Sequence, residues 1–168
     1  MRWLRSLFAA PDVVGIAEET LLFALEAARD THPNEYMGML QGTPASELAL
    51  DEEGTVVTDI TVIPGTESGP VSAKVKEWMR PNDTTSVGSI HSHPSGAIRP
   101  SDQDLATFGQ GQVHIILGAP YERRDWRAFE SDGTPRSLPV FDVELPDPAA
   151  FFDFDQADID AELREDAR

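Results

Sequence analysis

Two histidines and one aspartate have the residue types and the spacing of a metal site. His91 and His93 lie two residues apart at the end of an apolar run, and Asp104 follows eleven residues after the second histidine. On a β-strand, residues two apart point to the same face, so both imidazoles can reach one point. A loop with Gly96 and two prolines then turns the chain back and brings Asp104 to that point. Two imidazoles and one carboxylate leave a coordination position open, as in a catalytic zinc site, and this predicts a hydrolase.

The same three residues leave the identity of the metal open. Two histidines and a carboxylate also form the facial triad of non-haem iron oxygenases. The sequence has no His-Glu-x-x-His motif, and it contains no cysteine, which excludes disulfides, thiolate ligands and the Pro-Cys-x-x-Cys motif of zinc deaminases. The spacing alone does not separate zinc from iron.

Ser101 has one structural and one chemical interpretation. Ser-x-x-Asp before the apolar Leu105 and Phe108 is typical of a helix N-terminus, with Ser101 as the N-cap residue and Asp104 in the first turn. A hydroxyl beside a metal can also donate to a developing oxyanion. If the helix uses the Ser101 hydroxyl, its removal lowers stability more than rate.

Glu35 is the candidate general base. It follows Pro33-Asn34, where a helix is expected to end, and precedes an expected strand, so its side chain is presented at a rim. The chain has 30 acidic residues, most of which are expected at the surface, so residue type alone does not single out Glu35 as the base. Among the remaining histidines, His114 lies in an apolar run and is expected to be a hydrogen-bonded core residue. His32 is expected to interact with a helix dipole.

The order of the expected elements predicts a single α/β domain. Residues 1–15 are expected to form an N-terminal extension, 16–145 the domain, and 146–168 an acidic C-terminal tail with a phenylalanine cluster. Apolar periodicity and turn residues predict helices at 16–31 and 101–109. The same patterns predict strands at 36–41, 48–50, 55–63, 71–75, 86–93, 113–117, 125–130 and 138–145, although Trp78 and Met79 leave a helix possible after 71–75. Turn residues predict two hairpins, one joining 48–50 to 55–63 and one joining 125–130 to 138–145.

The charge of the chain excludes some partners. The net charge is −17, and the 13 basic residues comprise eleven arginines and only two lysines, Lys74 and Lys76. An acidic surface almost without lysine indicates adaptation to molar salt, and it argues against nucleic-acid binding because no basic patch exists to neutralise phosphates. No apolar run approaches the ~20 residues of a membrane span, so we expect no membrane partner and a cytoplasmic location.

Taken together, these residues resemble the JAMM (MPN+) metalloprotease family. The family signature is an upstream glutamate, then His-x-His-Pro, then a serine separated from the second histidine by seven residues, and an aspartate after two more residues. Here it reads Glu35, His91-Ser92-His93-Pro94, Ser101 and Asp104, with every spacing kept. The glutamate also stands in the expected setting, Pro-x-Glu-x-x-Gly-x-Leu-x-Gly at 33–42. The resemblance spans roughly 16–145 and implies a curved mixed β-sheet packed with helices, similar to cytidine deaminases.

The resemblance also implies roles and a substrate. It implies that His91, His93 and Asp104 bind one zinc ion per chain, that Glu35 is the general acid/base, and that Ser101 stabilises the oxyanion. It implies cleavage after the C-terminal Gly-Gly of ubiquitin-like modifiers, here small archaeal modifier proteins, as in archaeal desampylases. Because a Gly-Gly tail has no side chains, we expect strand addition beside the site to hold it, either at 71–78 or at the loop after His93. The alternatives are a RadC-like protein, which segment 91–104 also resembles, and a non-catalytic MPN binding module.

Overall fold

The computed structural model describes residues 11–62, 67–68, 73–74, 86–109 and 111–146. Within these ranges the chain forms one eight-stranded mixed sheet, in the order β10-β1-β3-β2-β6-β7-β8-β9, and a separate two-stranded pair, β4-β5. The elements are β1 (Val13–Ala17), α1 (Glu18–Thr31), β2 (Met37–Pro44), the 3-10 helix η2 (Ala45–Leu48), β3 (Thr55–Val62), β4 (Glu67–Ser68), β5 (Ala73–Lys74), β6 (Ser86–His93), α2 (Asp102–Phe108), β7 (Val113–Gly118), β8 (Trp126–Phe129), β9 (Pro135–Arg136) and β10 (Val140–Phe141).

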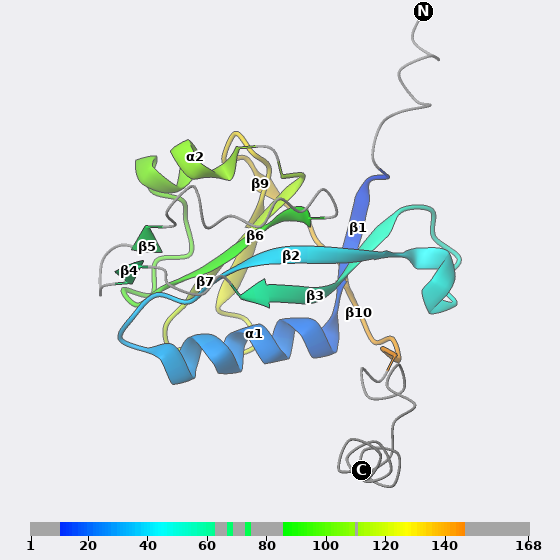
Figure 1. Ribbon diagram of the computed structural model, residues 1–168, viewed down its shortest axis with the longest axis horizontal. Helices are drawn as coiled ribbons and strands as arrows, with labels where there is room; N and C mark the ends of the chain where they lie inside the picture. Colours follow the sequence, from blue (N-terminus) through cyan, green and yellow to red (C-terminus); the bar gives the residue numbers. More distant parts are fainter. Residues whose placement is uncertain (1–10, 63–66, 69–72, 75–85, 110, 147–168) are drawn as a thin grey trace, which may run out of the picture.

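Two helices lie on opposite faces of the sheet (Figure 1). Helix α1 begins with Glu18 and Glu19, whose charges suit the positive end of the helix dipole, and it buries a stripe that includes Leu21, Leu25 and Ala28. The expected start at residue 16 is wrong, because residues 16 and 17 complete β1, which pairs with both β3 and β10. Sheet pairing therefore overrides the local helical pattern at this boundary.

Strands β6 and β7 are neighbouring inner strands of the sheet, and their side chains alternate between its two faces. The strands are parallel, and α2 lies on the connection between them. Because side chains alternate along a strand, one face joins α1 and the other joins α2. The α1 face carries the larger core, which includes Ile90, Val113, Ile115 and Leu117; the α2 face carries a smaller one of Phe108, Ile116 and Phe129.

Most expected strands are present, but two assignments are wrong. The segment 48–50 is not a strand: Leu48 is the last residue of η2, and Ala49 adopts a left-handed conformation with φ of 56°. The expected hairpin between 125–130 and 138–145 is also different, because β8 pairs with β9 and β10 instead lies parallel to β1 at the far edge. Of the expected strand at 71–75, residues 73 and 74 form β5, and the rest lies outside the described residues.

None of the helices in the described ranges is both long enough and apolar enough to cross a membrane.

Candidate metal centre

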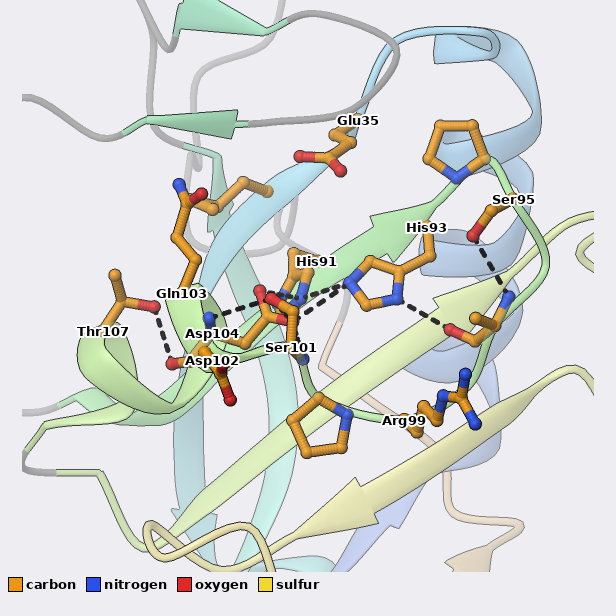
Figure 2. A pocket seen from close by; sticks show the side chains of 14 residues that line it. Glu35, His91, His93, Ser95, Arg99, Ser101, Asp102, Gln103, Asp104 and Thr107 are labelled. Carbon is orange, nitrogen blue, oxygen red and sulfur yellow. Dashed lines mark hydrogen bonds and ion pairs between the residues drawn. The ribbon is translucent and has the colours of Figure 1, made fainter.

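The two histidines of the motif project from the same face of β6. His91 and His93 both point toward the side of the sheet that α2 covers, as alternation along the strand requires (Figure 2). Gly88, earlier in β6, allows close contact with β7, since a Cβ there would lie 1.7 Å from the carbonyl oxygen of Val113. The expectation that this strand aims both imidazoles at one point is confirmed.

Asp104 reaches the histidines from the first turn of α2. Ser101 is the N-cap residue, and its hydroxyl accepts a hydrogen bond from the Asp104 amide at 3.2 Å. In return, Oδ2 of Asp104 accepts from the Ser101 amide at 2.6 Å and from the Ser101 hydroxyl at 2.7 Å. This reciprocal arrangement is a capping box, and it fixes the carboxylate rigidly at the helix start.

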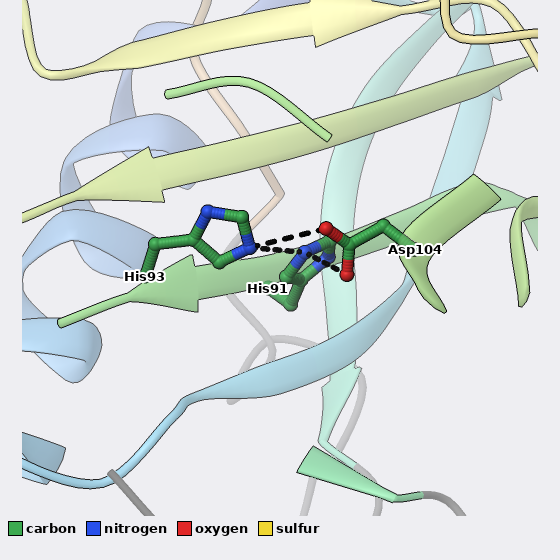
Figure 3. Close-up of side chains that lie close together, drawn as sticks. All are labelled: His91, His93 and Asp104. Carbon is green, nitrogen blue, oxygen red and sulfur yellow. Dashed lines mark hydrogen bonds and ion pairs between the residues drawn. The ribbon is translucent and has the colours of Figure 1, made fainter. Parts of the chain in front are cut away.

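The three candidate ligands form a compact group (Figure 3). The Nε2 atoms of His91 and His93 are 3.1 Å apart, and they lie 3.1 Å and 3.3 Å from Oδ1 and Oδ2 of Asp104, respectively. Bonds of about 2.0–2.1 Å would place neighbouring ligand atoms of a tetrahedral zinc site about 3.3–3.4 Å apart. The observed separations are close to these, so the group fits a zinc ion with little movement.

A hydrogen bond on the far side of His93 fixes its tautomer. Nδ1 of His93 lies 2.7 Å from the carbonyl oxygen of Ala97. Because a carbonyl only accepts, Nδ1 carries a proton. Nε2 can therefore donate to Asp104 only when the ring is protonated, and in the neutral ring Nε2 keeps its lone pair for a metal. The loop after β6 therefore orients the imidazole as a ligand.

The charge of Asp104 stabilises this arrangement. Burial by itself would raise the pKa of Asp104, but hydrogen bonds from His91 and His93 hold that pKa well below its usual range. For His93 the effect of burial is opposite, because burial by itself would lower the pKa of the imidazole. The hydrogen bonds to Asp104 and Ala97, together with the negative charges of Asp104 and Glu35, raise that pKa instead. Asp104 is thus ionised, as a metal ligand must be.

An aromatic contact anchors the end of α2 over the same face. The ring of Phe108 is buried, and its centroid lies 6.4 Å from the centroid of the His91 ring. The same ring stacks on that of His114, with the centroids 4.2 Å apart and an interplanar angle of 4°. His114 is itself buried in β7 and lies 2.8 Å from the Ser89 hydroxyl through Nδ1. The expectation that His114 is a hydrogen-bonded core residue is confirmed.

The triad lies at the base of an open pocket of ≈ 530 Å³. Glu35 enters this pocket from the segment that leads into β2, across from the α2 side chains (Figure 2). The structure therefore brings all five residues of the motif into one pocket, whose other lining residues include Met37, Arg99, Gln103 and Thr107. The side chains of His91, His93 and Asp104 are 6%, 13% and 15% exposed, so a substrate carbonyl can approach them.

The sequence pattern did not indicate a group of hydroxyls on the opposite face of β6. Ser92, between the two histidines, is fully buried and accepts a hydrogen bond from the Tyr36 amide at 2.8 Å. Burial raises the pKa of Tyr121, and the Ser92 hydroxyl opposes this by lowering it, as a donor facing the phenol oxygen does. The Tyr121 hydroxyl lies 3.2 Å from Nδ1 of His32. His32 thus has a specific partner besides its place at the end of α1. The sequence could have indicated Ser92 through its position. It lies between the two histidines on the same strand, so its side chain must point to the opposite face of the sheet.

Comparison with known proteins agrees with this site. Residues 18–129 match the family of prokaryotic homologs of the JAB domain. A probable metalloprotease of Haloferax volcanii is 58% identical over 157 residues, which cover 94% of this chain and 98% of that protein.

Solved structures are similar over most of the domain. A structure described as a JAMM metalloprotease-like zinc site in the proteasome and signalosome is 27% identical with a TM-score of 0.56, covering 77% of this chain and 99% of that one. A JAB1/MPN domain protein from Archaeoglobus fulgidus is also 27% identical with a TM-score of 0.56, covering 77% of this chain and 97% of the other.

The fold and the site thus define a hydrolase of the metalloprotease class, with zinc as its cofactor. The chain belongs to the JAB-domain family of JAMM/MPN+ metalloproteases. The expected α/β fold of that family is confirmed.

Proposed function

We propose that the chain is a zinc-dependent isopeptidase that hydrolyses the bond between the C-terminal Gly-Gly of a ubiquitin-like modifier and a target lysine. The observation that carries this proposal is the convergence of the three candidate ligands and Glu35 on one open pocket. The complete JAMM motif supports it, since non-catalytic members of the family are expected to lack a ligand or the glutamate.

In this proposal His91, His93 and Asp104 hold the zinc ion, the histidines through Nε2 and the aspartate through its carboxylate. When bound, zinc supplies Lewis acidity, which polarises a carbonyl and makes water more acidic. The carboxylate offsets part of the positive charge, and the hydrogen bond from His93 to Ala97 keeps that imidazole oriented.

Glu35 moves the proton. Its carboxylate takes a proton from the attacking water as the oxygen bonds to the scissile carbonyl carbon. When the carbon–nitrogen bond breaks, Glu35 gives that proton to the departing lysine amine. The half-buried position of Glu35 at the pocket edge suits both transfers.

Ser101 also lines the pocket, and we propose that its hydroxyl helps to stabilise the developing oxyanion. In the structure this hydroxyl is engaged with Asp104, so orientation of the carboxylate is its first task.

Substrate recognition follows from the chemistry of the tail. Gly-Gly has no side chains, so the extended backbone is held by hydrogen bonds to the enzyme beside the site. The expected edge strand around 71–78 lies mostly outside the described residues, while the loop after His93 contributes Pro94, Ser95 and Ala97 to the pocket. We propose that the two glycines are held in a narrow channel, so replacing Gly-Gly by Ala-Ala should stop cleavage.

The test is hydrolysis of a modifier–lysine conjugate at about 2 M salt, with and without a chelator. We expect cleavage that stops on chelation and returns with zinc. Asp104→Asn should lose both zinc and activity, whereas Asp102→Asn, a neighbouring exposed carboxylate in the same helix and pocket, should keep both. Stoichiometric zinc without cleavage of any conjugate would support a binding module, and chelator-insensitive cleavage would refute the metalloprotease mechanism.

A further inference from the structure

We propose that Ser92, the residue between the two histidines, positions Glu35 through the peptide group that joins Glu35 to Tyr36. In this role Ser92 contacts neither metal nor substrate and is a positioning residue. The inference rests on the proposed function in one respect, the assignment of Glu35 as the base.

Ser92 is separated from the metal pocket by its own strand. It follows His91 in β6, so its side chain points to the opposite face, beneath which α1 and the larger core lie. Its exposed fraction is 0%, and a buried hydroxyl must be hydrogen-bonded to offset the loss of water. Packing alone would favour alanine at this position, so the partners of the hydroxyl indicate what it does.

The main partner is the backbone of Tyr36. The Tyr36 amide donates to Oγ of Ser92 at 2.8 Å, and the Ser92 amide donates to the Tyr36 carbonyl at 2.9 Å. Strand β2 begins only at Met37, whose ladder partner in β6 is His91. The serine therefore extends the pairing by one residue beyond the ladder. The backbone nitrogen of Tyr36, which donates to Ser92, is part of the peptide bond that joins Tyr36 to Glu35.

A second group of contacts holds the serine hydroxyl in place. Against the effect of burial, which raises the pKa of Tyr121, the Ser92 hydroxyl lowers it, as a donor facing the phenol oxygen does. The Tyr121 hydroxyl lies 3.2 Å from Nδ1 of His32. A consistent assignment has Ser92 donating to Tyr121 and Tyr121 donating to His32, which leaves Oγ of Ser92 free to accept from Tyr36. The chain of hydroxyls thus fixes the direction of the Ser92 proton.

Tyr121 is strongly constrained. It is 2% exposed and adopts a φ of 63°, a conformation that is unfavourable for a bulky residue and persists only where the surroundings enforce it. Arg29 of α1 donates to its carbonyl at 2.8 Å. Burial raises the pKa of Tyr121 and the negative charge of Glu35 adds to that effect, so the carboxylate lies within electrostatic reach of this network. The network therefore joins α1, β6 and the segment that carries Glu35.

The test compares two serines of the same strand. Ser92→Ala removes the contact with Tyr36, while Ser89→Ala removes a hydroxyl that contacts His114 instead. With the zinc-loaded protein we expect Ser92→Ala to lower kcat about 10-fold or more with KM little changed, because a small misplacement of a base is costly. Zinc content should remain one per chain in both variants. Ser89→Ala should keep the wild-type kcat.

A readout independent of catalysis is hydrogen exchange of the Tyr36 amide, measured by NMR. Its exchange should be about 10-fold faster in Ser92→Ala, the factor expected for one lost hydrogen bond, and unchanged in Ser89→Ala. Tyr121→Phe, which keeps the ring and removes only the hydroxyl, should produce a smaller effect of the same kind. This variant also tests the proposal if Ser92→Ala fails to fold.

The outcomes separate the inference from the proposed function. Faster exchange at Tyr36 with no cleavage even by the wild-type protein would refute the function and leave the structural link standing. Wild-type cleavage with unchanged kcat in Ser92→Ala, an equal loss in Ser89→Ala, or loss of zinc from Ser92→Ala would overturn the positioning role.

Discussion

The Ser101 hydroxyl donates to Oδ2 of Asp104 across 2.7 Å, and the Asp104 amide donates back to Oγ of Ser101 across 3.2 Å. The same aspartate lies within 3.3 Å of both candidate histidine ligands. One side chain therefore completes a helix cap and a candidate metal site, so the stability of α2 and the affinity for zinc are linked.

Ser101→Ala should show this linkage. Loss of an N-cap serine destabilises a protein by about 1 kcal/mol, and loss of an outer hydrogen bond to a metal ligand weakens metal affinity about 10–100-fold. Thermal unfolding and a competitive zinc titration measure the two effects. Ser95→Ala is the control, since Ser95 lines the same pocket and its hydroxyl accepts a long hydrogen bond from the Ala97 amide, at 3.4 Å. Wild-type zinc affinity with a large fall in kcat would favour the oxyanion role alone.

Glu35→Gln should separate catalysis from metal binding. The amide keeps the shape of the side chain but cannot accept the proton, so kcat should fall by about 10²–10⁴-fold. Metal analysis should still find one zinc per chain. Glu47→Gln, which changes an exposed side chain of η2, serves as the control for the loss of one negative charge. If Glu35→Gln loses its zinc, Glu35 is a ligand and the assignment of the base is wrong.

His114 makes the metal-free protein sensitive to acid. Burial lowers the pKa of His114 to about 4, whereas the unfolded chain keeps the ordinary value of 6.5. The unfolded state therefore binds the extra proton first, and stability is lost as the pH falls from 6.5 toward 4. A difference of this size corresponds to about 3 kcal/mol.

Urea unfolding of the zinc-free protein at pH 7 and pH 4.5, at constant salt, tests this. His114→Gln should be less stable than the wild type at pH 7 because it loses the stack on Phe108. It should lose less stability on acidification. An equal loss in both proteins would show that His114 does not control acid sensitivity.

Salt should stabilise the protein. With 30 acidic and 13 basic residues, repulsion between carboxylates opposes the compact state in dilute buffer. Within the described residues, Arg123 pairs with Glu18 and Arg136 with Glu130, which leaves most carboxylates to be screened by ions. At molar salt the Debye length falls to about 3 Å. We expect the melting temperature and the peptidase activity both to rise from about 0.1 M to about 2 M salt, and a flat or falling melting temperature would contradict halophilic adaptation.

The sequence predicts most of the elements that carry the site, because their signals are local. The strand 86–93 matches β6, and the cap residue, apolar positions and terminal glycine of 101–109 define α2. Strand β10 could not be placed in the same way. It consists of Val140 and Phe141, and its partner is the distant β1, so only the assembled sheet determines its position.

The candidate site likewise has one part that the sequence predicts and one part that it does not. The ligands and Glu35 follow from a motif whose spacing is visible in the chain. The contact between Ser92 and Tyr121 depends on how β6, β7 and the turn after β7 assemble, and no spacing rule encodes it. The division into 1–15, 16–145 and 146–168 remains a prediction.

The pairing of β10 with β1 has a consequence for folding during synthesis. Ile16 lies opposite Val140, and the ring of Phe141 fills the space beside Gly15, where a Cβ would approach it to 2.3 Å. Strand β1, the first strand within the described residues, is therefore synthesised long before β10 can pair with its outer edge. During that interval the edge exposes unpaired amide and carbonyl groups, which favour association with other nascent chains. Slow translation should prolong this exposure.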